Sequence, residues 1–543
     1  MKTIEVDDRS DTEKYQKPDF ENYQFQKIST EDPLVWQLYQ SGDVKGLFQV
    51  ESALCQQWCK KIKPKNLDEL SALISLVRPG GLESGFCEKY ANIKNGLEEP
   101  SYIHPALEPI LGKTYSCLVF QESILRICID IAGFSDIEAD NARRAVGHKL
   151  PEEMDKVKVL FMEGSAKKGI VSKEIAEEIF SWIQKSVRYL FCAGHSYSYS
   201  YTSYFGAYQK RYFPTEFYTS ALTFSDEKLD PKLEVYELVQ DAKRHNVKIL
   251  PPDIRERNID FKILRDKLIL FGLCHIRNIG RASIEELQDP ENDFSTFTGV
   301  LKSLGKVKRS VIESIIKSGG CDCYGLSRNQ MLRTIYVICG RNEVDLRGDD
   351  LAVSRPLSPI ELKYFHLAIG QFTVQQILQK ILDEEICIKT RRPAIEAKLK
   401  YLENIPKETN RQKAIWEKLY LGLNLTCSAA DDFTKNENAK TCKEIYSQPV
   451  ANEKEWKNKG KNSVTMHVVV DSIKEVESKT NGNKFGILKV SDSSGVLDLM
   501  VFSKNWEQYK PELMEGIVCC INGRKNLFKD RESVIVEDIE IIG

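Results

Sequence analysis

The 543-residue chain lacks the features that mark membrane and secreted proteins. No apolar run approaches the roughly 20 residues that a membrane-spanning helix needs. The first residues, Met-Lys-Thr-Ile-Glu-Val-Asp-Asp, do not contain the apolar core of a signal peptide. We therefore expect a cytoplasmic protein without a membrane partner.

An excess of positive charge is also missing. Lys and Arg together number 77 and Asp and Glu 79, so the formal net charge is −2. Binding to nucleic acid would therefore depend on local basic patches within a balanced whole. The hydrophobic content of 42% is ordinary for globular proteins, and the length predicts several domains.

Metal-binding patterns are absent as well. The 15 cysteines include no CxxC pair, and no cluster of His and Cys has zinc-ligand spacing. Cys321 and Cys323 lie too close together, with no second pair nearby, to form a convincing site. We expect reduced, mostly buried thiols and no metal site on this chain.

A short basic segment is the most informative feature that is present. Within residues 140–149, Arg143, Arg144 and Lys149 supply three cations, with His148 beside them. The planar guanidinium fits phosphate oxygens, and a basic cluster on a loop or helix end suits a triphosphate. The alternative for this segment alone is a solvated basic turn.

Three further stretches accompany it in a fixed order. Val77-Arg-Pro-Gly-Gly81 and Val119-Phe-Gln-Glu122 precede it, and Phe191-Cys-Ala-Gly-His195 follows. Together the four resemble the fingers of the DNA polymerase III alpha subunit, the bacterial replicative polymerase of the C family. In that family the four motifs read roughly RPGP, VYQEQ, LRRAMGKK and YGFNKSH. The resemblance implies polymerase fingers over residues 26–250. Residues 1–25 are polar and rich in charge, so we expect them to form a loose leader.

The resemblance implies that five residues bind the incoming dNTP: Arg78, Arg143, Arg144, Lys149 and His195. Gln121 and Glu122 are expected to form a structural hydrogen-bonding pair that positions the basic segment. The chain departs from the family where Cys192, Ala193 and Gly194 replace Asn-Lys-Ser. This change removes a lysine expected near the nucleotide. His195 is either a phosphate donor or a buried structural histidine.

Several helices are predicted in the fingers. Apolar spacing indicates helices over residues 33–39 and 67–77, two helices between residues 151 and 188 split near Gly169, and helical structure over residues 214–250. The run Ser196-Tyr-Ser-Tyr-Ser-Tyr-Thr-Ser-Tyr204 alternates with period two, as a strand would. Because Tyr201, Tyr204 and Tyr208 fall on one helical face, and the family has a helix here, we predict a helix.

Residues 268–280, followed by a helix over 282–287, and residues 306–320 resemble the two halves of a tandem helix-hairpin-helix. We therefore expect a DNA-binding domain over residues 251–340. A glycine-bearing turn before a helix presents backbone N–H groups to a DNA phosphate. The implied contacts to primer-template DNA are Arg277, Asn278, Gly280, Lys308 and Arg309.

Residues 341–460 form an expected helical connector, with helices over residues 360–382 and 394–402. The resemblance also implies a sliding clamp as a partner, bound through a peptide of the QxxLF type. The nearest match, Gln375-Gln-Ile-Leu378, fits an ordinary amphipathic helix better.

The last segment, residues 461–543, alternates as five strands over 464–470, 485–490, 496–502, 517–522 and 534–541, with Thr480-Asn-Gly-Asn483 as a hairpin turn. This pattern predicts an oligonucleotide-binding (OB) barrel, although such barrels also dock proteins. The mixture of cations and aromatics that single strands favour would come from Lys484, Phe485, Arg524, Lys525 and Phe528. The fold class is therefore multidomain and mostly α, with a C-terminal all-β OB-like barrel.

The carboxylates of a polymerase metal site are not recognisable. The family's palm carries them in PDxDxDF and KxDFLGL, and neither pattern occurs here. We expect a split polymerase, as in a phage or divergent bacterial replicon, in which a partner chain supplies the palm and holds Mg²⁺. A phage protein would act in the host cytoplasm. The alternative is a non-catalytic DNA-binding or replisome accessory protein derived from the fingers.

Overall fold

The computed structural model describes residues 28–83, 85–148, 151–186, 190–340, 354–433, 438–448, 463–478, 482–528 and 531–542. The chain divides into two compact units, one ending at Phe217 and the other beginning at Tyr218. The boundary lies within α12 (Pro214–Thr223).

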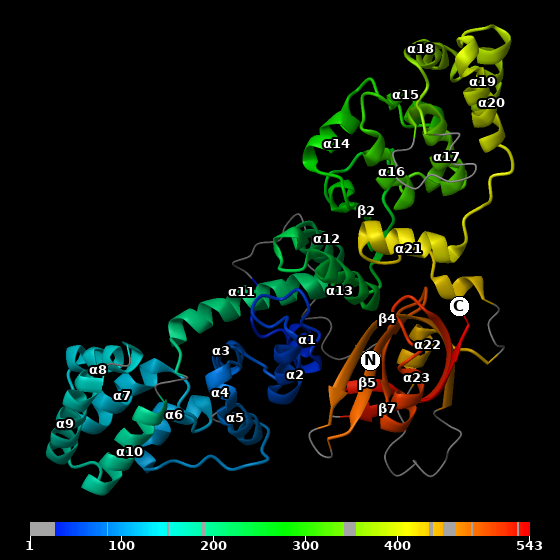
Figure 1. Ribbon diagram of the computed structural model, residues 1–543. Helices are drawn as coiled ribbons and strands as arrows, with labels where there is room; N and C mark the ends of the chain where they lie inside the picture. The colour runs from blue at the N-terminus through cyan, green and yellow to red at the C-terminus, as the bar shows by residue number, and fades with distance from the viewer. Residues whose placement is uncertain are drawn as a thin grey trace. The chain divides into compact units, whose positions relative to one another are not determined.

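The first unit is helical (Figure 1). Asp32, Ser52 and Asn66 cap successive helices by accepting hydrogen bonds from first-turn N–H groups. Its helices are α1 (Pro33–Ser41), α2 (Ala53–Ile62), α3 (Leu67–Leu76), α4 (Pro79–Glu83), α5 (Phe86–Lys94), α6 (Glu108–Leu111), α7 (Gln121–Ala132), α8 (Asp136–His148), α9 (Pro151–Lys168), α10 (Lys173–Ser186) and α11 (Ala193–Tyr212).

Two packed groups organise this unit. Helices α7 to α10 share one apolar core, which includes Ile127, Phe161 and Phe180. The predicted pair of helices around Gly169 is confirmed by α9 and α10. The tyrosine-rich run is helical in α11, also as predicted, and packs on α3 through a buried hydrogen bond of 2.6 Å between Ser71 and Ser196.

The second unit begins within α12 and continues with α13 (Pro231–Arg244). The helical structure predicted over residues 214–250 is wrong at its end, because residues 248–250 form the first strand of a small sheet that the sequence did not predict. Strands β1 (Lys248–Leu250), β3 (Leu268–Leu270) and β2 (Lys262–Arg265) lie in that order. The sheet leads into α14 (Arg281–Gln288), α15 (Phe297–Ser303), α16 (Arg309–Lys317) and α17 (Arg328–Cys339). These four helices carry the predicted hairpins.

The connector contains α18 (Pro359–Ala368), α19 (Val374–Asp383), α20 (Arg392–Tyr401), α21 (Asn410–Leu421) and α22 (Cys442–Ser447). The single helix predicted over residues 360–382 is wrong, because the chain turns between α18 and α19 at Gly370, whose φ is +104°. Helix α21 contacts both neighbouring domains. Its Glu417 pairs with Arg328 of α17, and Ala414 packs against Val469 and Val518 of the C-terminal barrel.

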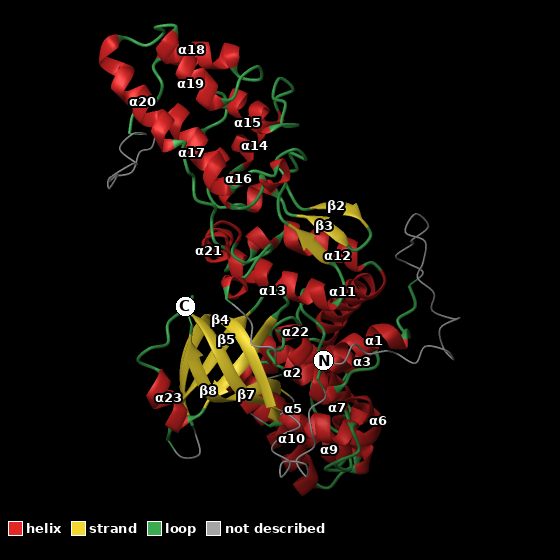
Figure 2. Ribbon diagram, turned by 90° about the vertical axis from the view of Figure 1, so that its right-hand side faces the viewer, coloured by secondary structure: helices red, strands yellow, loops and turns green. Residues whose placement is uncertain are grey.

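The C-terminal strands close into a barrel in the order β4-β5-β6-β8-β7 (Figure 2). They are β4 (Ser463–Glu477), β5 (Lys484–Ser491), β6 (Val496–Val501), β7 (Val518–Phe528) and β8 (Arg531–Ile541), with α23 (Ser503–Tyr509) after β6. The predicted strands and barrel are confirmed. Gly486 is required by packing, since a Cβ there would lie 2.3 Å from the Trp506 ring.

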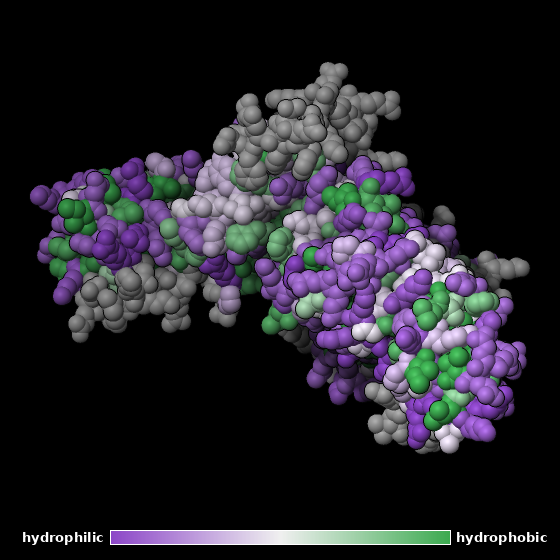
Figure 3. All heavy atoms as spheres, turned by 90° about the horizontal axis from the view of Figure 1, so that it is seen from above, coloured by the Kyte–Doolittle hydropathy of each residue, from purple (hydrophilic) through white to green (hydrophobic). Residues whose placement is uncertain are grey.

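The cysteine prediction agrees with the structure. All fifteen cysteines are free thiols, and most are buried. Across the described part of the chain, no helix combines the length and apolarity needed to cross a membrane. On the face seen in Figure 3, hydrophilic side chains predominate and apolar ones occur in small groups.

Candidate functional site

Arg78, at the end of α3, is held against an aromatic ring. Its guanidinium carbon lies 3.6 Å from the centre of the Phe191 ring, within the range of a cation–π contact. Partial burial lowers the pKa of Arg78, while Tyr199 acts in the opposite direction. The stacking fixes the plane of the guanidinium, and so the direction in which it offers its N–H groups.

The backbone of Phe191 ties two of the sequence motifs together. Gln121 donates its N–H to the Phe191 carbonyl over 2.9 Å, and Phe191 donates to the Val119 carbonyl over 3.2 Å. The two segments thus form a short parallel bridge between Phe120 and Phe191. This bridge places the start of α7 beside the start of α11.

Gln121 contacts the basic segment, as expected, whereas Glu122 holds the start of α11 instead. The Gln121 side-chain carbonyl accepts a hydrogen bond of 3.4 Å from Arg143 Nη1. Glu122 accepts 2.8 Å from the N–H of Ala193 and 3.3 Å from the Cys192 thiol. A carboxylate at this place stabilises the N-terminus of α11.

Asp140 holds both arginines of the basic segment on α8. It accepts from Arg143 Nε at 2.9 Å and pairs with Arg144 Nε at 2.8 Å. The hydrogen bond from Arg143, together with the charges of both arginines, lowers the pKa of Asp140. The Arg144 side chain is 63% exposed and that of Arg143 only 30%, so Arg144 is the more available to a ligand.

His195 and Lys149 are the remaining residues that were predicted to contact the nucleotide. His195 is exposed on the first turn of α11, with its ring centre 3.9 Å from that of Tyr199. The buried structural role is therefore excluded for His195. Lys149 lies outside the described residues.

A chain of contacts therefore connects the other four predicted residues. Arg78 and His195 both contact the Phe191 ring, and the Phe191 backbone is hydrogen-bonded to Gln121, whose side chain reaches Arg143. Asp140 then joins Arg143 to Arg144. The role of Phe191 as the link between these residues was not predicted from the sequence. An aromatic residue four positions before the histidine is the only local signal.

In the first hairpin, the predicted DNA contacts lie at the surface. Arg277, Asn278 and Gly280 are exposed, and Asn278 has a positive φ of 71°. Gly280 precedes α14 and provides no side chain to cap it. The first N–H groups of α14 thus lack a partner within the helix and can meet a phosphate.

In the second hairpin, the two predicted contacts differ. Lys308 is exposed and is the N-cap residue of α16, without a capping side chain. Arg309 instead pairs with Glu313 at 2.9 Å and donates to the Gly340 carbonyl. These bonds anchor Arg309 within the domain, so Lys308 is the better candidate for a DNA contact.

The barrel requires one correction. Lys525 is buried, and its ammonium donates to the carbonyls of Tyr446 and Gln448 over 2.7 and 2.6 Å. It therefore anchors α22 to β7 and is not available to DNA.

The other four barrel residues that were predicted to contact DNA differ in their surroundings. Lys484 is exposed and pairs with Glu475 at 3.2 Å, while Phe485 lies 6.3 Å from Phe502, centre to centre. Arg524 pairs with Glu537 at 2.5 Å. Phe528 ends β7, and its side chain lies outside what the structure describes.

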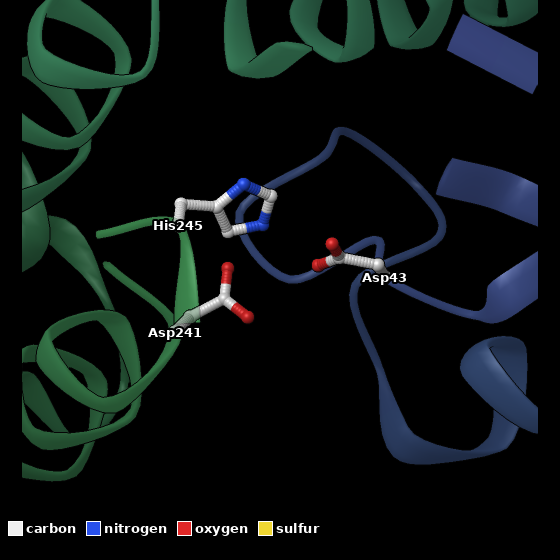
Figure 4. A group of neighbouring side chains, drawn as sticks. All are labelled: Asp43, Asp241 and His245. Atoms are coloured by element: carbon white, nitrogen blue, oxygen red, sulfur yellow. The ribbon is translucent and has the colours of Figure 1, made fainter. Parts of the chain in front are cut away.

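The predicted clamp-like peptide, residues 375–378, lies in α19. Ile377 and Leu378 of the clamp-like peptide are buried in α19, which agrees with an amphipathic helix. Figure 4 labels Asp241 in α13 and His245 just after it; the third labelled residue, Asp43, lies in the loop after α1. Asp241 accepts from Tyr218 at 2.6 Å and from Arg244 at 2.7 Å, a structural role. Asp43 belongs to the other unit, where it pairs with the buried Lys210 at 2.9 Å.

Three family models match the chain in succession. The bacterial DNA polymerase III alpha subunit finger domain matches residues 9–169, a helix-hairpin-helix motif residues 246–331, and an OB-fold nucleic acid binding domain residues 464–542.

Similar proteins are named DNA polymerase III subunit alpha. That of Haemophilus influenzae is 28% identical over 507 residues, which cover 92% of this chain and 40% of the relative. For Borreliella burgdorferi the identity is 26% over 533 residues, covering 96% and 42%. For Aquifex aeolicus it is 34% over 316 residues, covering 57% and 27%. The chain thus spans less than half the length of these relatives.

Proposed function

Since the chain is related to the C-terminal region of the DNA polymerase III alpha subunits, we propose that it is the nucleotide- and DNA-binding part of a replicative DNA polymerase. The first unit would bind the incoming dNTP, and the two hairpins and the barrel would bind primer-template DNA. The carboxylates that hold Mg²⁺ would come from a palm on a partner chain. A replicative role would place the protein in the cytoplasm.

The observation that supports nucleotide binding is the fixing of three guanidinium groups by neighbouring side chains. Phe191 orients Arg78, Gln121 and Asp140 orient Arg143, and Asp140 orients Arg144. A triphosphate carries several negative charges, and more charge develops on the leaving pyrophosphate in the transition state. Cations that are already oriented stabilise such charge without reorganising. The Mg²⁺ ions would activate the primer hydroxyl, while this chain would hold the triphosphate.

One observation favours the second candidate, a DNA-binding accessory protein without nucleotide chemistry. The segment Cys192-Ala-Gly194 supplies no lysine before His195, and Ala193 and Gly194 form the first turn of α11. Both candidate functions include the same DNA contacts. They differ only in whether the chain also binds the incoming nucleotide.

DNA binding by the hairpins is tested by the salt dependence of affinity. With Arg277→Gln and Lys308→Gln combined, the slope of log affinity against log salt should become shallower by about two units, about 0.9 for each lost phosphate contact. The measurement is titration of a duplex oligonucleotide at several salt concentrations.

Lys407→Gln is the matched control, since Lys407 is also exposed but lies in the loop before α21. It should leave the slope unchanged. An unchanged slope in the double variant would show that these two residues of the hairpins do not contact DNA phosphates.

A further inference from the structure

The turn between α18 and α19 has the same backbone geometry as the hairpin between α15 and α16. Leu304 and Val307 form an isolated parallel bridge between α15 and α16, and Ile369 and Phe372 form the same kind of bridge between α18 and α19. The glycine after the first bridge residue has a φ of +101° at position 305 and +104° at position 370. In Figure 1 all four helices lie in the upper part of the second unit.

The hydrogen bonds of the two turns correspond as well. Lys306 and Val307 both donate to the Ser303 carbonyl, over 3.0 and 2.9 Å. Gln371 and Phe372 both donate to the Ala368 carbonyl, over 3.1 and 3.3 Å. In each case the acceptor is the last residue of the preceding helix.

The helices that follow also bury equivalent positions. Ile312 and Ile316 lie seven and eleven residues after Gly305, and Ile377 and Ile381 lie seven and eleven residues after Gly370. All four side chains are buried. The segments before and after the two turns therefore share one helix-hairpin-helix construction. The family model ends at residue 331, before the second of them.

Lys302 of α15, in the second hairpin, lies over the turn between α18 and α19. A Cβ built on Gly370 would be 3.6 Å from Lys302 Nζ. Lys302 is exposed and forms no salt bridge with any residue that the structure describes. Its position adds positive charge to a turn whose own residues, Gln371 and Thr373, are neutral and exposed.

We propose that the turn Ile369–Thr373, together with Lys302, is a third contact to a DNA backbone phosphate. It rests on the proposed function, since it assumes that the two matched hairpins bind DNA. The N–H groups at the start of α19 have no partner within the helix, and Lys302 supplies the charge that Lys308 supplies in the second hairpin. One difference is that Thr373 caps α19 by accepting from the Gln376 N–H at 3.2 Å, whereas Lys308 has no such side chain. The third contact thus depends more on Lys302.

The test changes the charge at each turn of the full chain, by adding a carboxylate or by removing the Lys302 ammonium. Gln371→Glu and, separately, Lys302→Gln should each weaken duplex binding about tenfold, as expected for a charge-assisted hydrogen bond, and make the salt slope shallower by about 0.9. Lys308→Glu reports on the matched hairpin. Gln379→Glu, at an exposed position midway along α19, is the matched control and should leave binding unchanged.

The outcomes separate the two proposals. Weakening by Lys308→Glu, Gln371→Glu and Lys302→Gln, but not by Gln379→Glu, supports the third contact. Weakening by Lys308→Glu alone overturns it and leaves the proposed function standing. If none of them weakens binding, both proposals fail for these hairpins. Circular dichroism and melting temperature verify that each variant is folded.

Discussion

Replacing Arg144 by alanine should lower the rate of nucleotide incorporation by roughly 30- to 1000-fold, once the chain is combined with a palm-bearing partner. This corresponds to about 2–4 kcal/mol of activation free energy, as for removal of a preorganised donor that stabilises developing charge. Arg144 has the larger expected effect because its side chain is the more exposed of the two that Asp140 holds. DNA affinity should hardly change, since the lost contact is to the triphosphate. The measurement is single-turnover incorporation.

Two companion variants define the cause. Arg144→Lys should recover only part of the rate, because lysine keeps the charge but loses the two-pronged geometry. Arg126→Ala is the matched control, since Arg126 forms an exposed pair with Asp130 at 3.4 Å on α7 of the same unit. If Arg144→Ala and Arg143→Ala both keep near-normal rates, these cations are structural. The accessory-protein candidate would then lead.

The second large effect concerns stability. Arg328→Met should destabilise the second unit by about 3–5 kcal/mol, the range for breaking a buried ion pair from one side. Arg328 is fully buried and donates to Asp322 at 2.7 Å and to Glu417 at 2.8 Å. Glu417 is buried too, so the substitution leaves a carboxylate without its cation. Hydrogen exchange of the hairpin helices and α21 measures the loss.

An exposed pair in the same unit provides the control. Arg392 and Glu396 lie 3.4 Å apart with half-exposed side chains, so Arg392→Met should change stability by no more than about 1 kcal/mol. Equal and small effects of the two substitutions would show that the buried network does not hold α21 to the hairpins.

The barrel and most helices were predictable because they depend on local patterns. Alternation of apolar residues gave all five strands of the barrel, and apolar spacing gave α9 and α10. The tyrosine run shows the limit of a pattern, since its period of two favours a strand while α11 is a helix. There Ser196 and Ser200 are buried against the core, and small polar residues can occupy such positions when they are hydrogen-bonded.

The features that were predicted wrongly or missed depend on contacts between residues that are distant in the sequence. Strands β1, β2 and β3 have only three or four residues each, too few to show a period, and they form by pairing with one another. Lys525 was predicted to face DNA, but the carbonyls that bind it lie almost eighty residues earlier, at Tyr446 and Gln448. Nothing in its neighbours along the chain marks it as buried.

The residues of the candidate site could be predicted from the sequence, but the contacts between them could not. The order of the motifs indicated Arg78, Arg143, Arg144 and His195. The stacking of Arg78 on Phe191 and the capping of α11 by Glu122 depend on contacts between residues 70 or more positions apart. Such contacts leave no periodic signal in the sequence.

Primer extension tests the central claim most directly. The purified chain is incubated with primer-template DNA, dNTPs and Mg²⁺, alone and together with a chain that carries the PDxDxDF and KxDFLGL motifs, which is also assayed alone. The account predicts that neither chain extends the primer by itself and that the mixture does. Robust extension by this chain alone would contradict the assignment of the metal site to a partner, and a mixture that binds DNA without extending it would contradict the polymerase function.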